Sequence, residues 1–254
     1  MSARFLPVLF LLAACGGPPT LQGQVVDIWG TPIEGAVVIV QGQAGRPETD
    51  AQGRFTLPVI EGEHTLRVGA KGYIHTFHEF EVVAGADLPR PVIQLYPEPE
   101  ETGFYVVSHG QYTALQPQKV ERLGNELASI QGLRADPAVS VEVSSLEVIF
   151  HTDLKKSEIL QLGLELHHLD YVHQQELTGP LGKSPVTVNM WVSQGEVDTE
   201  LTQMRGRNDY RITTGPVEPG TYAFHTQGLL DPENLESFER IPSALRVAFP
   251  FTVK

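Results

Sequence analysis

The residues with the clearest potential for chemistry are histidines, of which the chain has nine. His167, His168 and His173 lie close together in the sequence, next to Asp170. Imidazole nitrogens are common ligands of zinc and copper. On an extended strand His167 and His173 share a face but lie about 20 Å apart. They could share one ion only if the chain bends between them, so metal binding by these three residues is a hypothesis.

A second group is formed by His75, His78 and Glu79. His75 and His78 fall on opposite faces of an extended strand and converge only in a turn. Neither group contains the His-Glu-x-x-His helix of zinc proteases. The sequence therefore assigns no metal, and we expect no cofactor.

Nucleophilic catalysis has little support in the sequence. Ser108-His109-Gly110 is not the Gly-x-Ser-x-Gly turn of serine hydrolases, and no glycine-rich loop opens a helix to hold a phosphate. Glu98, Glu100 and Glu101 lie in a proline-containing stretch and are interpreted as linker charge. We therefore expect a protein that is not an enzyme. Its formal net charge of −13 also argues against a nucleic-acid partner.

The single cysteine, Cys15, follows a basic start and a short apolar run that ends in Leu12-Ala13-Ala14. This is the layout of a secretory signal peptide, and the run is shorter than the roughly 20 residues that span a bilayer as a helix. Leu12-Ala13-Ala14-Cys15 resembles the lipobox of bacterial lipoproteins. The resemblance implies that 1–14 is removed, that Cys15 is acylated, and that 15–20 is a lipidated spacer.

The resemblance also implies an exported protein, held at a membrane by lipid. Gly16, rather than an aspartate, follows the cysteine, which resembles the outer-membrane sorting pattern of lipoproteins. The expected location is therefore the outer membrane. The expected partners are that membrane and an unidentified envelope protein or glycan.

Residues 21–96 show short apolar runs of period two, separated by turns such as Asp50-Ala51-Gln52-Gly53 and Lys71-Gly72. Strands of this kind indicate an all-β sandwich. With one cysteine no intramolecular disulfide can form, so apolar cores must stabilise the fold.

A family resemblance covers the same range. The series Gly23-x-Val25-x-Asp27, Gly30-x-Pro32-Ile33-x-Gly35-Ala36, Thr49-Asp50-x-x-Gly53-x-Phe55 and Ala70-x-Gly72-Tyr73 resembles the carboxypeptidase regulatory-like domain. The resemblance implies a seven-stranded, transthyretin-like sandwich without catalytic residues. It also implies a carbohydrate-binding-like fold, in which Trp29 and Tyr73 are candidate ligand contacts, although packing is the commoner role of such side chains.

The rest of the chain divides into a linker region and a second domain. In 97–138 we expect short strands and an amphipathic helix over 119–131, where Val120, Leu123, Leu127 and Ile130 recur at helical spacing. In 139–254 β patterns return and predict a second, immunoglobulin-like β-sandwich, with a Pro219-Gly220-x-Tyr222 corner.

Three local features of 139–254 can be checked directly. Leu160, Leu162, Leu164 and Leu166 predict one strand, whose change of phase predicts a bulge at His167-His168. Asp231-Pro232-Glu233 has the residue types that start a helical turn. Pro250 within Val247–Val253 predicts an edge strand.

The leading functional hypothesis is a non-enzymatic lipoprotein that binds or scaffolds something in the cell envelope. One alternative is a carbohydrate-binding module, with contacts at Trp29 and Tyr73. The other is a metal-binding lipoprotein that uses His167, His168 and His173.

Overall fold

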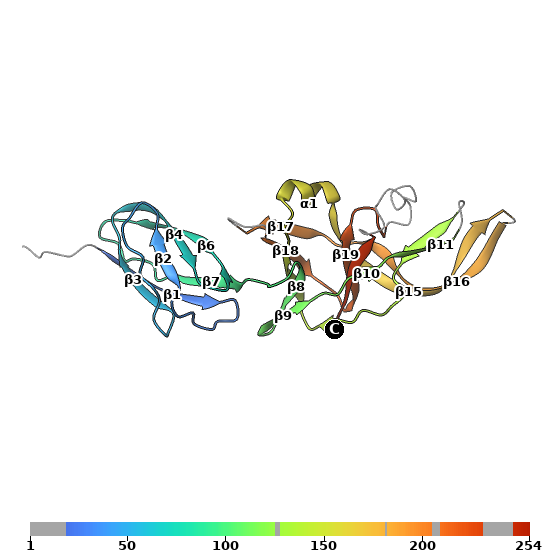
Figure 1. Ribbon diagram of the computed structural model, residues 1–254, viewed down its shortest axis with the longest axis horizontal. Helices are drawn as coiled ribbons and strands as arrows, with labels where there is room; N and C mark the ends of the chain where they lie inside the picture. The colour runs from blue at the N-terminus through green and yellow to red at the C-terminus, as the bar shows by residue number, and fades with distance from the viewer. Residues whose placement is uncertain (1–18, 125–127, 181, 205–208, 231–245) are drawn as a thin grey trace, which may run out of the picture. The chain divides into compact units, whose positions relative to one another are not determined.

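The computed structural model describes residues 19–124, 128–180, 182–204, 209–230 and 246–254. Almost every regular element in these ranges is a β-strand, so the predicted all-β fold class is confirmed. The chain forms two compact units, Met1–Pro97 and Glu98–Lys254 (Figure 1). None of the described residues belongs to a helix long and apolar enough to cross a membrane. Cys15 and Asp231-Pro232-Glu233 lie outside the described residues.

The first unit contains the seven strands expected for a transthyretin-like sandwich. They are β1 (Thr20–Asp27), β2 (Val37–Val40), β3 (Arg54–Pro58), β4 (Gly62–Gly69), β5 (Tyr73–Ile74), β6 (Thr76–Val82) and β7 (Val92–Pro97). One sheet has the order β3-β1-β7-β5 and the other β2-β4-β6. Alternate side chains of both sheets are buried in one apolar core, as the period-two pattern requires.

Two buried residues, Thr49 and Gly53, fix the loops of this sandwich. The Oγ1 of Thr49 accepts the Ala36 N–H at 2.8 Å and donates to the Ile33 carbonyl at 2.5 Å, and Thr49 is 5% exposed. Gly53 has a φ of +72°, and a Cβ there would lie 2.3 Å from the backbone oxygen of Val25. Only glycine fits this position, because it combines a left-handed backbone with a close backbone approach.

The second unit adds thirteen strands and one short helix. In chain order they are β8 (Gly103–Ser108), β9 (Gln111–Ala114), β10 (Gln118–Lys119), β11 (Glu121–Gly124), β12 (Ser129–Gly132), β13 (Ser140–Val141), β14 (Ser145–His151), α1 (Lys156–Leu162), β15 (Leu164–Gly179), β16 (Gly182–Glu196), β17 (Thr199–Gln203), β18 (Asp209–Pro216), β19 (Gly220–Thr226) and β20 (Val247–Val253). One sheet has the order β17-β18-β14-β8-β9, and the other β10-β20-β19-β15-β16 with β13 beside β20. These two sheets face each other across a shared apolar core.

The corner before β19 has the predicted geometry. The Tyr222 hydroxyl donates to the Glu218 carbonyl at 2.7 Å, and the ring is 4% exposed. Burial, together with the negative charge of Glu218, raises the pKa of Tyr222, so the phenol stays protonated and keeps donating. A tyrosine that bonds to the backbone a few residues upstream is typical of immunoglobulin-like sandwiches.

Strand β15 is buried on both faces near its start. Leu166 points into the core between the two sheets, whereas Leu169 points to a separate cluster on the opposite face. This explains the change of phase in the apolar pattern. The bulge predicted at His167-His168 is not present in β15, whose register with β19 runs unbroken from Leu164 to Leu169. The register with β16 does shift between His168 and Leu169, but the extra residue, Gln194, belongs to β16.

The helix predicted over 119–131 is wrong. The described parts of this segment are strands β11 and β12, which pair with each other. Val120 packs in the cluster that contains Leu133, whereas Ile130 packs against Val188 and Met190 of β16. The apolar residues at helical spacing therefore serve two separate clusters, not one helix face. The region expected to be a linker also contributes β8, which pairs with β14 inside the second unit.

Two strand predictions in the second unit are also wrong. Leu160 and Leu162 belong to α1, and Leu160 is 66% exposed. β20 is not an edge strand, because β19 pairs with it on one side and β10 and β13 on the other. The N–H of Thr252 donates to the Val139 carbonyl next to β13, so the nitrogen of Pro250, two residues earlier, faces the same side of β20. Pro250 lies between the residues of β20 that pair with β10 and those that pair with β13. No ladder hydrogen bond is lost there.

Candidate functional site

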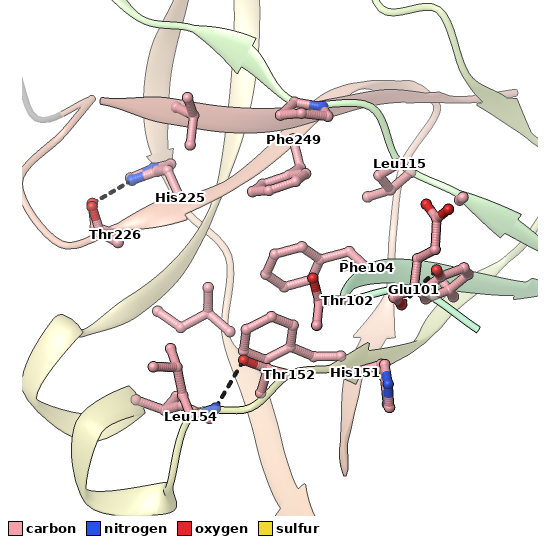
Figure 2. Close-up of a pocket in the computed structure, with 18 of the residues that line it drawn as sticks. Glu101, Thr102, Phe104, Leu115, His151, Thr152, Leu154, His225, Thr226 and Phe249 are labelled. Carbon is pink, nitrogen blue, oxygen red and sulfur yellow. Dashed lines mark hydrogen bonds between the residues drawn. The ribbon is translucent and has the colours of Figure 1, made fainter. Parts of the chain in front are cut away.

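A cavity of about 640 Å³ opens between the two sheets of the second unit, next to α1. Most of its lining is apolar, contributed by Phe104, Ala114, Leu115, Phe150, Leu154, Ile159, Leu162, Leu164, Val247 and Phe249. In Figure 2, Phe104 and Phe249 lie at the centre, with Leu115 on one side and His225 and Thr226 on the other. Cavities of about 300–1,000 Å³ with apolar walls and a few polar groups are typical of small-molecule sites.

Three phenylalanines line the cavity, Phe104, Phe150 and Phe249, and they belong to two cross-strand pairs, one in each sheet; Phe224, which completes the second pair, packs behind them. Phe104 and Phe150 are directly opposed on β8 and β14, and Phe224 and Phe249 on β19 and β20. The ring of Phe104 stacks on Phe150 at 4.3 Å and on Phe224 at 5.0 Å, and tilts against Phe249 at 4.7 Å. The rings thus brace one another across the sandwich and keep this wall in a fixed shape.

Helix α1 forms another side of the cavity. Ile159 is buried and Leu162 is 36% exposed, and both line the cavity, whereas Leu160 does not. The segment before the helix is fixed by the Leu154 N–H, which donates to Thr152 Oγ1 at 3.2 Å. A few polar residues also line the cavity, among them Glu101, Gln116 and Thr226.

A buried acid–base pair supports the strand that carries Phe150. His151 and Asp209 are cross-strand partners, and the Nδ1 of His151 lies 2.5 Å from Oδ1 of Asp209. Asp209 is 1% exposed, and its Oδ2 has no hydrogen-bond partner among the described residues. Among the described residues, His151 is the side chain that satisfies this buried carboxylate.

A second polar cluster, Glu165, His167 and His225, lies on the face of β15 and β19 away from the shared core. Glu165 and His225 are cross-strand partners, and His167 follows on the same face of β15. The His167 Nε2 is 3.4 Å, and the His225 Nδ1 3.9 Å, from Oε2 of Glu165. The two imidazole rings meet edge-on at 4.3 Å. These are the described residues that the structure brings together in a geometry able to hold a metal ion.

His225 is neutral in this environment. It is 2% exposed, and burial, with a smaller contribution from His167, lowers its pKa to about 3. Its Nδ1 lies 2.9 Å from the Thr226 carbonyl, which can only accept, so Nδ1 carries the proton. The Nε2 lone pair is buried and has no hydrogen-bond partner among the described residues.

Ser193, His167 and Glu165 also combine the residue types of a hydrolase triad. The Nδ1 of His167 lies 2.7 Å from Ser193 Oγ, and its Nε2 faces Glu165. In serine hydrolases the nucleophile usually meets Nε2 and the acid Nδ1, so the two sides of the ring are exchanged here. A triad of Ser193, His167 and Glu165 would also give the buried His225 no part in catalysis.

The three histidines proposed as metal ligands do not come together. His168 points to the other face of β15, where its ring lies 5.1 Å from that of Tyr222. His173 contacts Asn189 at 3.1 Å, further along the β15–β16 ribbon. The bulge therefore does not gather them, and His167 is joined by Glu165 and His225 instead. His75, His78 and Glu79 take part in no metal-type cluster among the described residues.

The candidate ligand contacts of the first unit are half-buried. Trp29 follows Asp27, whose Oδ1 accepts the N–H groups of Trp29 and Thr31 at 2.9 and 2.8 Å. Tyr73 packs against the core of the unit, and burial, with a contribution from Asp27, raises its pKa. Core packing explains the Tyr73 side chain as part of the fold, whereas the contact of Trp29 with Asp27 is made by its backbone N–H, and a carbohydrate ligand at Trp29 and Tyr73 stays a prediction.

Sequence reasoning missed the cavity and the Glu165–His225 pair. Alternation along a strand places Glu165 and His167 on one face, so the sequence indicates two of the three residues of the cluster. His225 joins it only through the register of β15 with β19. Likewise, no local pattern indicates that two phenylalanine pairs from separate sheets will meet.

Comparison with known families identifies the first unit. Residues 20–96 match the carboxypeptidase regulatory-like domain, which confirms the resemblance of the sequence in this range. The comparison with curated proteins gives no match.

Two solved structures are similar to the chain at low identity. One is a candidate carbohydrate-binding protein from Bacteroides uniformis, with 9% identity, a TM-score of 0.26, and coverage of 83% of this chain and 89% of that one. The other is BcpA, the major pilin subunit of Bacillus cereus, with 12% identity, a TM-score of 0.22, and coverage of 92% and 68%. At these TM-scores neither likeness supports a conclusion about the fold or the ligands of this chain.

Proposed function

We propose that this protein is a non-enzymatic lipoprotein of the cell envelope, whose second unit binds an apolar ligand in the cavity beside α1. The observation that carries the proposal is the cavity itself, with its wall of stacked phenylalanines between two sheets. Its volume of about 640 Å³ suits a molecule with an apolar body, such as an acyl chain or a small ring system. Glu101 and Gln116 offer contacts for a polar end.

The driving force for such binding is removal of apolar surface from water, worth about 25 cal/mol per Å². A charge placed in the wall opposes it, because the charge must lose water when the ligand enters. Leu162 and Leu160 give a matched pair on one helix: Leu162 lines the cavity, whereas Leu160 faces outward and is 66% exposed.

The test uses the neutral fluorescent probe N-phenyl-1-naphthylamine and the full chain carrying Cys15→Ser. We expect saturable fluorescence enhancement, weakened at least tenfold by Leu162→Glu and unchanged by Leu160→Glu. Equal affinity for both variants, or no saturable binding, would show that the cavity is not a ligand site.

Anchoring through Cys15 is tested separately in cells. Cys15→Ser should abolish incorporation of labelled palmitate and release the protein from the membrane fraction, because Cys15 is the only cysteine. Fractionation of inner and outer membranes then tests the expected outer-membrane location. A lipidated species in the Cys15→Ser strain would refute the anchor.

The non-enzymatic assignment rests on the acid–base geometry described above, in which the ring nitrogens of His167 are exchanged relative to a serine hydrolase. Purified protein should not hydrolyse p-nitrophenyl esters above the rate of the Ser193→Ala variant. Turnover that disappears in Ser193→Ala would overturn this part of the proposal.

A further inference from the structure

The cluster of Glu165, His167 and His225 is held together by the sheet itself. Glu165 and His225 face each other across β15 and β19, and His167 is the next residue on the same face of β15. All three are at least half-buried, and His225 is 2% exposed. Their positions are thus set by strand register and not by mobile loops, which favours a pre-formed site.

The spacing of the donor atoms fits one small cation. A tetrahedral ion with bonds of about 2.1 Å holds its ligand atoms about 3.4 Å apart. The His167 Nε2 and Glu165 Oε2 are 3.4 Å apart, and one ligand atom from each of the three residues lies within 4.8 Å of the others. Metal binding would draw the three ligand atoms closer, to about 3.4 Å from one another.

Each histidine already has the outer hydrogen bond that metal-bound histidines usually make. The His225 Nδ1 donates to the Thr226 carbonyl at 2.9 Å, and the His167 Nδ1 lies 2.7 Å from the Ser193 hydroxyl, which can accept from it. In His167 this leaves Nε2 facing Glu165, and in His225 it leaves Nε2 as the nitrogen that has no hydrogen-bond partner among the described residues. Metal-ligating histidines are commonly fixed in this way through their second nitrogen.

An independent observation points to a missing ligand. The Nε2 of His225 is buried and has no hydrogen-bond partner among the described residues. A buried acceptor without a partner costs about 1–3 kcal/mol. His225 shares this site with one carboxylate, of Glu165, and a second imidazole, of His167.

We propose that Glu165, His167 and His225 bind a divalent transition-metal ion of the Zn²⁺ type. Two imidazoles and a carboxylate are ligands that suit Zn²⁺, and three protein ligands leave a fourth position for water or a further ligand. His225 also borders the proposed apolar cavity, but the cluster lies on the face of β15 and β19 away from the shared core, and metal binding does not depend on ligand binding in the cavity.

The test titrates Zn²⁺ into the full chain carrying Cys15→Ser, which removes the only thiol of the chain. Calorimetry with a competing chelator should give one Zn²⁺ per chain. Glu165→Gln and His225→Ala should weaken binding by more than about 100-fold, because even residues behind the ligands typically contribute about 10–100-fold. Ser193→Ala removes only the hydrogen-bond partner of the His167 Nδ1, so it should weaken Zn²⁺ binding by about 10–100-fold.

The controls are His168→Ala, on the opposite face of β15, and His173→Ala, further along the ribbon, and neither should change the affinity. Glu165→Gln keeps the size of the side chain, so it remains informative if His225→Ala fails to fold. Zn²⁺ should also shift the ¹⁵N resonance of the His225 Nε2 while the Nδ1–H signal persists. Equal affinity in the parent and Glu165→Gln, loss of binding in either control, or absence of binding would overturn the site.

Discussion

The buried pair of His151 and Asp209 permits a prediction in which the same substitution has opposite effects in two backgrounds. Asp209 is 1% exposed, and the His151 side chain, 23% exposed, supplies the hydrogen bond at 2.5 Å that satisfies one carboxylate oxygen. The other oxygen has no partner among the described residues. The carboxylate therefore depends on this histidine.

The expected magnitudes follow from this geometry. Removing one partner of a fully buried charged pair costs about 3–5 kcal/mol. Because water can partly replace the His151 ring, we expect about 2–3 kcal/mol for His151→Ala. Asp209→Asn alone should cost about 1 kcal/mol, since the amide keeps a weaker hydrogen bond.

The double variant is the decisive case. In the His151→Ala background, Asp209→Asn removes a buried charge that has lost its donor, so it should stabilise the protein by about 1 kcal/mol. The coupling energy of the cycle is then about 2 kcal/mol, within the usual range for residues in contact. His109→Ala, exposed in the β8–β9 turn, should stay within about 0.5 kcal/mol of the parent.

The assay is urea unfolding followed by tryptophan fluorescence. The chain has two tryptophans, so Trp29→Phe leaves Trp191 as a reporter of the second unit alone. All variants are made in that background with Cys15→Ser. If Asp209→Asn destabilises the protein equally with and without His151, the coupling is zero and the proposed dependence of Asp209 on His151 is refuted.

Three further contacts in the two sandwiches are tested by urea unfolding, followed by Trp29 for the first unit and by Trp191 for the second. Thr49→Val should cost about 2–3 kcal/mol, because it leaves a buried N–H and a buried carbonyl without their shared partner, whereas the exposed Thr56→Val should be near neutral. Gly53→Ala should destabilise more than Gly30→Ala, for which about 1–2 kcal/mol is expected, since both have positive φ but only Gly53 faces a backbone oxygen at 2.3 Å. Tyr222→Phe should cost about 1 kcal/mol through loss of the corner hydrogen bond. Equal stabilities within the threonine or glycine pair, or an unchanged Tyr222→Phe midpoint, would contradict the respective contact.

Much of the first unit could be predicted from its sequence because its signals are local. The alternation of buried residues such as Phe55 and Leu57 needs only the pleat of a single strand. The turn at Asp50 is similar, since its Oδ1 accepts the N–H groups of Gln52 and Arg54 within the same loop. These interactions join residues a few positions apart, so composition and spacing carry them directly.

Prediction failed where one segment serves more than one core. Val120 and Ile130 are spaced like the face of a helix but pack in different clusters. Leu164 and Leu166 continue the parity of Leu160 and Leu162, yet a helix and a strand meet between them at Gly163. The spacing of apolar residues indicates which residues are buried, but it does not indicate which other element they pack against.

By itself, the sequence determined the all-β class and the corner before Tyr222, because both rest on patterns within one strand or one turn, whereas the seven strands of the first unit were implied by its resemblance to the carboxypeptidase regulatory-like domain. Only the tertiary structure decided where chemistry could occur. The cavity exists because phenylalanine pairs from two sheets face each other, and His225 meets Glu165 and His167 because of the pairing register of β15 and β19. Register between distant strands is set by the packing of whole sheets, which no short stretch of the chain encodes.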